Sequence, residues 1–143
     1  MSNISIYSRG SYENLSSDFL KDKAIIRIHN INDKQWYPNE EPNKLVLFFN
    51  DEKNNNISLI EKYKAILGFE TKCLNKKKAI KIIDYIKNNK EKDFIIHCEY
   101  GKSRSVAIAI FLRDNLGYSI INKKPEELKQ YNDWVFFLLK KFY

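Results

Sequence analysis

One short segment of the sequence places reactive and polar residues between two apolar runs. In FIIHCEYGKSRSVAIAIFL, residues 94–112, Cys98 stands six residues before Arg104, with Gly101 between them. A thiol beside a helix N-terminus and a guanidinium ionises more easily, and the thiolate is both a nucleophile and a leaving group. The planar fork of an arginine binds two oxygens of a phosphate group. The segment therefore indicates a nucleophilic cysteine next to a bound oxyanion.

The residues from Cys98 to Arg104 are expected to form the anion-binding loop. Gly101 can adopt backbone angles that other residues avoid, so that successive N–H groups turn inward toward an anion. Ser105 could donate a hydrogen bond to the sulfur, and His97 would orient the loop from the end of its strand. The predicted phosphate-binding residues are Glu99, Tyr100, Gly101, Lys102, Ser103 and Arg104.

Strand and helix patterns alternate along the chain and predict the scaffold for this loop. Short Ile-rich or continuously apolar runs predict strands at 3–8, 23–30, 45–50 and 93–97. Amphipathic or apolar runs predict helices within 57–70, 75–90 and 103–117, with a short helix after the first strand and one or two helices near the end. We therefore expect a single domain, residues 1–143, with an α/β three-layer sandwich fold. Its four- to five-stranded central sheet should be largely parallel and flanked by helices.

The stretch HCEYGKSRS resembles the His-Cys-x5-Arg-Ser/Thr signature of cysteine-dependent protein tyrosine and dual-specificity phosphatases. It is especially similar to the loops of small bacterial and phage phosphatase-like proteins. The pair Ser8 and Arg9, the stretch from Phe49 to Asp51 and the helix KKAIKIIDYI occur in the same order in those proteins. The resemblance implies a four- to five-stranded sheet flanked by helices, no metal or other cofactor, and a phosphocysteine intermediate.

The leaving oxygen of a phosphomonoester needs a proton donor, and the resemblance implies an aspartate from a loop after an upstream strand. Asp51 fits this role because it directly follows the apolar run 45–50 and should lie at the same sheet edge as Cys98. It would protonate the leaving oxygen and then deprotonate the water that hydrolyses the phosphocysteine. Glu52 is the alternative, because segment 52–74 is longer than in typical dual-specificity phosphatases.

Four residues outside the loop carry further expectations. Asn132, in YNDWV, is similar to an Asn-containing stretch of the related proteins, which implies that it braces the loop. Trp36 and Tyr37 lie in a loop with two prolines, where they could line the pocket mouth and stack on a phosphotyrosine ring or simply cover an edge of the core. Cys73 is expected to be a free thiol.

The composition limits the cellular compartment and the binding partners that we expect for the protein. Two cysteines do not make a disulfide framework, and no apolar run approaches the roughly 20 residues of a membrane span, so we expect a cytoplasmic protein without a span. The net charge of +7 suits anionic partners, although Lys, Asn and Ile are all abundant, as in proteins from AT-rich genomes. No zinc-ligand spacing or RNA-binding signature accompanies the charge, so nucleic acid is not the first choice of partner.

Together these patterns predict a phosphomonoester hydrolase of the protein tyrosine or dual-specificity type. Its expected partners are a phosphorylated protein or another phosphomonoester, with phosphate, sulfate or vanadate as anions that fit the loop. One alternative is a phosphoinositide or RNA 5′-phosphatase, which Lys102 and the net charge favour and the charge of Glu99 opposes. Another alternative is a catalytically silent phosphate-binding module.

Overall fold

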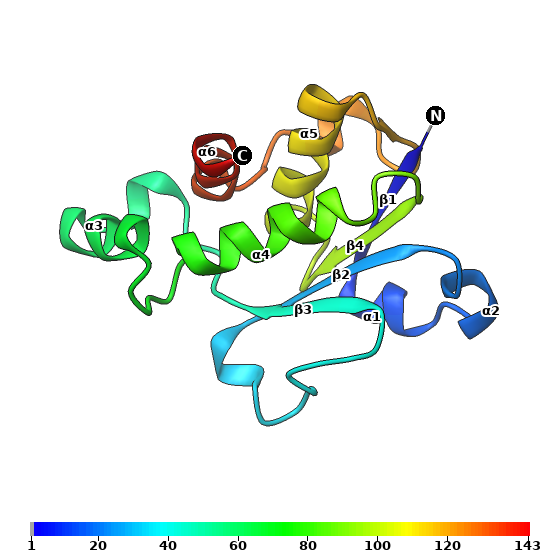
Figure 1. Cartoon of the computed structure of the whole chain (residues 1–143), viewed down its shortest axis with the longest axis horizontal. Coiled ribbons are helices and arrows are strands. Elements are labelled where there is room, and N and C mark those ends of the chain that lie inside the picture. Colours follow the sequence, from blue (N-terminus) through cyan, green and yellow to red (C-terminus); the bar gives the residue numbers. More distant parts are fainter. Residues whose placement is uncertain (1) are drawn as a thin grey trace.

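The computed structural model describes residues 2–143 and has an α/β fold built on one five-stranded sheet (Figure 1). The strands lie in the order β3-β2-β4-β1-β5, and every pairing between them is parallel. Their carboxyl ends therefore share one edge of the sheet. Their bounds are β1 (Asn3–Ser8), β2 (Ala24–His29), β3 (Lys44–Phe48), β4 (Phe94–Cys98) and β5 (Ser119–Ile120).

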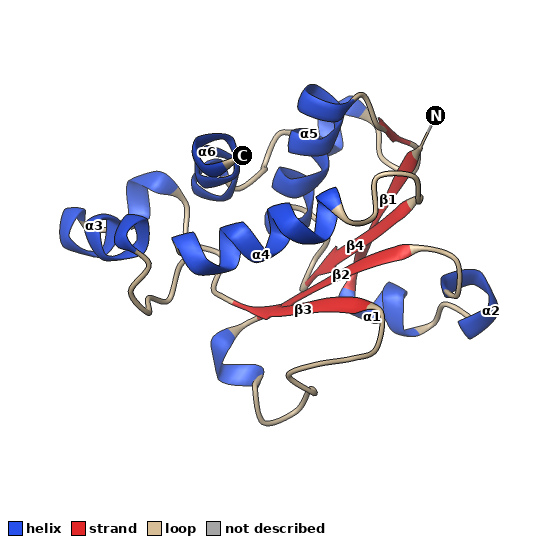
Figure 2. Cartoon of the chain, viewed as in Figure 1, coloured by secondary structure: helices blue, strands red, loops and turns tan. Residues whose placement is uncertain are grey.

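Helices cover both faces of this sheet, so the expected sandwich of helices around a parallel sheet is confirmed (Figure 2). The helices are α1 (Arg9–Glu13), α2 (Ser17–Leu20), α3 (Leu59–Leu67), α4 (Lys76–Lys87), α5 (Arg104–Leu116) and α6 (Asp133–Phe142). Single turns of 3-10 helix occur at η1 (Ile31–Asp33), η2 (Asn54–Asn56) and η3 (Pro125–Leu128). α4, α5 and α6 enclose the larger core, whereas α1 and the chain around α2 cover the opposite face.

Strands β2 and β4 lie side by side and are buried on both faces, although Arg27, His29 and His97 interrupt their apolar runs. Every residue of β2 and of β4 is buried. Alternate side chains point to opposite faces: Ile26 and Ile96 join the core under α4 and α5, whereas Ile25 and Ile95 pack with Tyr12 of α1. The loop that follows β4 therefore starts from the most rigid part of the sheet.

Helix α5 is the other rigid support of that loop. Its first nine residues, from Arg104 to Leu112, are all buried, which accounts for a sequence that is apolar nearly all round. Gly117 ends the helix in a left-handed conformation with φ of 74°. Because α5 is enclosed, its N-terminal turn has a fixed position relative to the end of β4.

The observed elements differ from the expected ones at a few boundaries. β4 extends through Cys98, so the cysteine ends the strand instead of following it. β3 ends at Phe48, and the apolar Phe49 comes after the ladder although it is fully buried. β5 was not predicted because it contains only two residues, too few to form a periodic pattern. Within residues 2–143, no helix is both long and apolar enough to cross a bilayer.

The buried stripe of α4 gives a direct test of the core. Ile82 is fully buried, whereas Ile80 on the same helix is 37% exposed. We expect Ile82→Ala to lower the free energy of unfolding by about 2–5 kcal/mol, because it leaves a cavity beside the sheet. The matched control, Ile80→Ala, should change it by less than about 1 kcal/mol. Urea unfolding of both variants measures the difference, and equal losses would show that α4 does not pack as described.

Candidate active site

The loop between β4 and α5 follows a path that only glycine permits at position 101. Gly101 has φ of +70°, in the left-handed region. A Cβ atom there would lie 2.8 Å from both the Tyr7 carbonyl carbon and the Ser8 backbone nitrogen. The loop is also joined to the end of β1 by a backbone hydrogen bond from Arg9 to the Glu99 carbonyl, at 3.2 Å. Gly101 therefore has backbone angles that other residues avoid, as expected. Its close approach to β1 is a second reason for glycine at this position.

Cys98 lies at the base of this loop with its sulfur beside the first turn of α5. The side chain is buried, and Sγ is 3.0 Å from the Ser105 hydroxyl oxygen. Burial alone would raise the pKa of the thiol, but hydrogen bonds from the Ser105 side chain and backbone and the charge of Arg104 outweigh it. The pKa of Cys98 consequently lies below the usual value for a cysteine. By contrast, burial raises the pKa of Cys73, which remains an ordinary free thiol in the core.

Arg104 is buried beside Cys98 and has one buried nitrogen without a hydrogen-bond partner. Its Nη1 donates to the Phe49 carbonyl oxygen at 2.7 Å, which ties the guanidinium to the chain just after β3. Its Nε is buried and, within residues 2–143, finds no hydrogen-bond acceptor. An unpaired buried donor on a charged group costs free energy, and a bound oxyanion would supply the missing acceptor.

The loop residues and the aspartate predicted as general acid enclose one small cavity of about 150 Å³. Its wall is formed by Asp51, Lys53, Cys98, Tyr100, Lys102, Ser103, Arg104 and Gln130. Sequence reasoning missed Lys53 and Gln130, because neither belongs to a motif or a periodic pattern. Among the described residues, no group of three or more His, Cys, Asp or Glu side chains could hold a metal ion.

Asp51 enters this cavity and is held there by two donors. Its Oδ1 accepts hydrogen bonds from the Ser103 hydroxyl and from Asn132 Nδ2, both at 2.7 Å. A proton carried by this carboxyl would therefore reside on Oδ2. Glu52, the alternative acid, is not part of the cavity wall, and burial together with the nearby charge of Glu61 raises its pKa.

Asn132 links three parts of the site. Its side-chain oxygen accepts the Val135 N–H and so caps α6, while its Nδ2 donates to Asp51. Its backbone N–H donates to the Ser103 carbonyl at 3.1 Å. The side chain is fully buried, which leaves it little freedom to move. Asn132 thus contacts both the loop and the aspartate, as the resemblance implied for a bracing residue.

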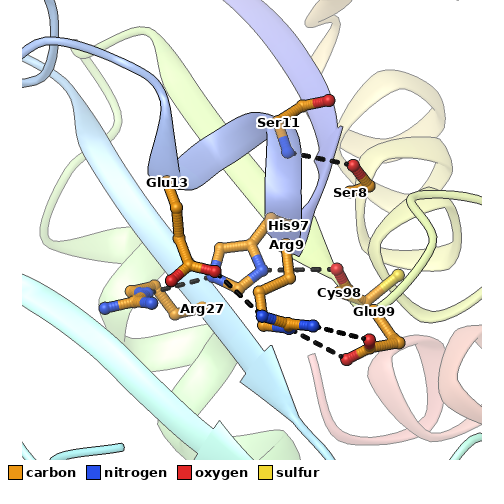
Figure 3. A network of polar contacts seen from close by, with 8 residues as sticks. All are labelled: Ser8, Arg9, Ser11, Glu13, Arg27, His97, Cys98 and Glu99. Carbon is orange, nitrogen blue, oxygen red and sulfur yellow. Dashed lines mark hydrogen bonds and ion pairs between the residues drawn. The ribbon is translucent and has the colours of Figure 1, made fainter.

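His97 contacts the backbone carbonyl of Cys98 at the base of the loop (Figure 3). Its Nε2 accepts a hydrogen bond from Arg27 Nε at 3.0 Å, so the ring proton is assigned to Nδ1. Nδ1 is 3.4 Å from the Cys98 carbonyl oxygen and can donate to it. Burial and the charge of Arg27 lower the pKa of His97 to about 3, so the ring is neutral at pH 7. Arg27 is itself paired with Glu41.

Glu99 does not place its charge in the cavity, contrary to the expectation that it would repel a polyanion. Its carboxylate accepts two hydrogen bonds from Arg9, from Nε at 3.2 Å and from Nη2 at 3.1 Å (Figure 3). Arg9 also pairs with Glu13, one turn further along α1. The hydrogen bond from Arg9 outweighs burial and keeps the pKa of Glu99 low, so its carboxylate is charged and paired with Arg9 at the end of β1.

The two aromatic residues of the loop after β2, Trp36 and Tyr37, are not part of the cavity wall. Tyr37 stacks on His29 with ring centroids 4.0 Å apart, so it covers the end of β2. Trp36 is 72% exposed and is not in the cavity wall. Tyr100, on the loop itself, is the aromatic side chain that borders the cavity. Tyr37 therefore has the other role expected for it, because it covers an edge of the core.

Comparison with models of known protein families and with the sequences of curated proteins gives no match. The assignment of function therefore depends on the loop motif and on the geometry of this site.

Gly101 provides a test of the loop geometry. We expect Gly101→Ala to abolish detectable binding of inorganic phosphate or vanadate, because the new methyl group cannot fit against the end of β1 without displacing the loop. It should also lower the free energy of unfolding by at least about 1 kcal/mol, the cost of a side chain at positive φ. Calorimetric titration and urea unfolding measure the two effects.

Gly10→Ala is the matched control, since a Cβ atom at position 10 has no neighbour within 4 Å. It should bind the anion like the unchanged protein. If Gly101→Ala also bound normally, the described contact between loop and β1 would be wrong.

Proposed function

We propose that the protein is a cysteine-dependent phosphatase for phosphorylated proteins, of the protein tyrosine or dual-specificity type. The observation that carries the proposal is the meeting of three groups in one cavity. These are Cys98 with a lowered thiol pKa, Arg104 with an unpaired buried donor, and Asp51 held by two hydrogen bonds. A nucleophile, an anion receptor and a proton donor are what hydrolysis of a phosphomonoester requires.

In the first step, the Cys98 thiolate attacks phosphorus and forms an S–P bond while the ester P–O bond breaks. Asp51 gives the proton on Oδ2 to the departing oxygen, so the alcohol or phenol leaves neutral. Arg104 and the backbone N–H groups at the start of α5 bind the non-bridging oxygens, on which negative charge is concentrated in the transition state. The products of this step are the free alcohol and a phosphocysteine.

In the second step, water attacks the phosphorus of the phosphocysteine. The Asp51 carboxylate takes a proton from that water, the S–P bond breaks, and inorganic phosphate is released. The sulfur leaves as a thiolate, which the Ser105 hydroxyl stabilises by a hydrogen bond across the observed 3.0 Å. Both proton transfers use Asp51, so the group returns to its starting state after each turnover.

A second candidate is a phosphatase for polyanionic substrates such as phosphoinositides or RNA 5′-phosphates. Lys53 and Lys102 flank the cavity beside Arg104, and Glu99 is paired with Arg9 and does not line the cavity. This basic wall favours a substrate with more than one phosphate. Turnover of an inositol polyphosphate compared with turnover of a phosphotyrosine peptide distinguishes the two candidates.

The roles of Cys98 and Arg104 are tested with a simple aryl phosphate. We expect Cys98→Ser to remove turnover, because an alcohol does not ionise near neutral pH. We expect Arg104→Lys to lose about 100-fold or more, since an ammonium cannot make the two-pronged contact. Cys73→Ala, which changes the other thiol, should keep normal turnover. A silent binding module would show no turnover in any of these proteins, and near-normal turnover in Arg104→Lys would contradict the role of Arg104.

The role of Asp51 is tested by changing the leaving group. We expect Asp51→Asn to slow hydrolysis of an alkyl phosphate by about 10²–10⁴-fold, whereas an activated aryl phosphate, whose leaving group needs little protonation, should lose far less. Glu52→Gln is the control and should affect neither substrate. Equal losses on both substrates in Asp51→Asn would place the proton donor elsewhere.

A further inference from the structure

Helix α3 exposes most of its apolar side chains. Leu59, Ile60, Tyr63 and Leu67 are each at least 63% exposed, and Ala65 is the buried residue of the helix. The helix is nevertheless well capped, by the Ser58 side chain at its start and by Gly68 at its end. In Figure 1, α3 lies beyond α4, at the border of the molecule. Contiguous apolar surface of this kind marks a site of interaction.

A groove of about 380 Å³ separates α3 from α6. Its apolar wall consists of Leu59, Tyr63 and Ile66 from α3 and of Trp134 and Phe137 from α6. The floor is rigid, because Trp134 is buried and its indole N–H donates to the Leu74 carbonyl at 2.9 Å. Phe137 stacks on Trp134 and is 47% exposed. The groove therefore has the size and lining to take a bulky apolar side chain.

The groove adjoins the candidate active site through two pairs of consecutive residues. Lys53 lines the catalytic cavity, and the next residue, Asn54, lines the groove. On the segment opposite, Asn132 donates to Asp51, and the next residue, Asp133, lines the groove. The backbone N–H of Asn54 donates to the Asp133 carboxylate at 2.8 Å. This hydrogen bond joins the segment that contains Lys53 and Asn54 to the segment that contains Asn132 and Asp133. The two hollows are therefore neighbours, at a spacing that one peptide segment could span.

Charge along this route suits an anionic ligand. Lys53 and Lys102 flank the catalytic cavity, and Lys62 lines the groove. The acidic residue of the groove, Asp133, is hydrogen-bonded to the Asn54 backbone. Basic side chains beside an apolar slot complement a phosphorylated peptide with a large apolar residue near its phosphate.

We propose that the groove between α3 and α6 docks the substrate of the neighbouring site. The occupant is a segment of a phosphorylated protein that places its phosphate beside Cys98 and a bulky apolar side chain between Tyr63 and Phe137. This inference rests on the proposed phosphatase function. It adds that the protein selects substrates by an apolar residue close to the phosphorylated one.

The test compares acidic phosphotyrosine peptides in which Leu, Phe or Ser is placed in turn at each neighbouring position. At one or more positions, the unchanged protein should give kcat/KM about tenfold or more higher for Leu or Phe than for Ser, as expected for burial of one such side chain. Leu59→Ala and Tyr63→Ala should each reduce this preference severalfold, and together they should remove it. Their turnover of a small aryl phosphate should be unchanged.

Leu67→Ala is the matched control, because Leu67 is on the same helix and is 68% exposed but does not line the groove. It should keep the full preference. The inference is overturned if the aryl phosphate is hydrolysed but no position shows a preference, or if the preference survives in Leu59→Ala/Tyr63→Ala. It is also overturned if sedimentation shows a dimer that Tyr63→Ala dissociates while the peptide preference stays intact, because a second copy would then occupy the groove. Failure to hydrolyse the aryl phosphate itself would instead refute the proposed function.

Discussion

The lowered pKa of one buried thiol is the feature on which the candidate site depends. A thiolate is costly to bury, and the low pKa of Cys98 requires donors that more than compensate for that cost. The Ser105 hydroxyl, the backbone N–H groups of Ser103 and Ser105 and the charge of Arg104 supply them. All belong to, or directly precede, the first turn of α5. The same donors would bind phosphate oxygens, so the environment that lowers the pKa of the thiol also suits a bound phosphate group.

These donors are useful only if they are held in place, and the fold holds the loop from several sides. α5 is buried along its first nine residues, so its N-terminal turn cannot shift without disturbing the core. On the β1 side, Gly101 packs against the backbone and Arg9 pairs with Glu99. On the β2 side, Arg27 and His97 fix the Cys98 carbonyl, and Asn132 ties the Ser103 carbonyl to α6. Such a prearranged site need not reorganise when charge develops on the substrate.

The fold and the closeness of Cys98, Arg104 and Asp51 could be predicted because their signals are local. Short Ile-rich runs identified the strands β2 and β4, and the spacing of Cys98 and Arg104 identified the loop. The rule that parallel strands end at one edge placed Asp51 near Cys98. Each of these inferences needs only a few neighbouring residues and one general property of parallel sheets.

The remaining contacts could not be predicted because they depend on strand order. Arg27 meets His97 across 70 residues, and Arg9 meets Glu99 across 90, since β4 lies between β2 and β1 in the sheet. No periodic pattern specifies that order. The same limitation explains why the sequence left two positions open for Tyr37, which covers His29. It also explains why the groove beside α3 was not foreseen, since its second wall comes from α6.

The charge on Cys98 can be measured directly by the pH dependence of its alkylation in Cys73→Ala protein, where it is the single remaining thiol. We predict that the inflection lies below that of the same protein unfolded in urea. In a Ser105→Ala variant it should move to higher pH, because a hydrogen bond to the thiolate is lost. An inflection equal to that of the unfolded chain, or one that Ser105→Ala leaves unchanged, would contradict the account.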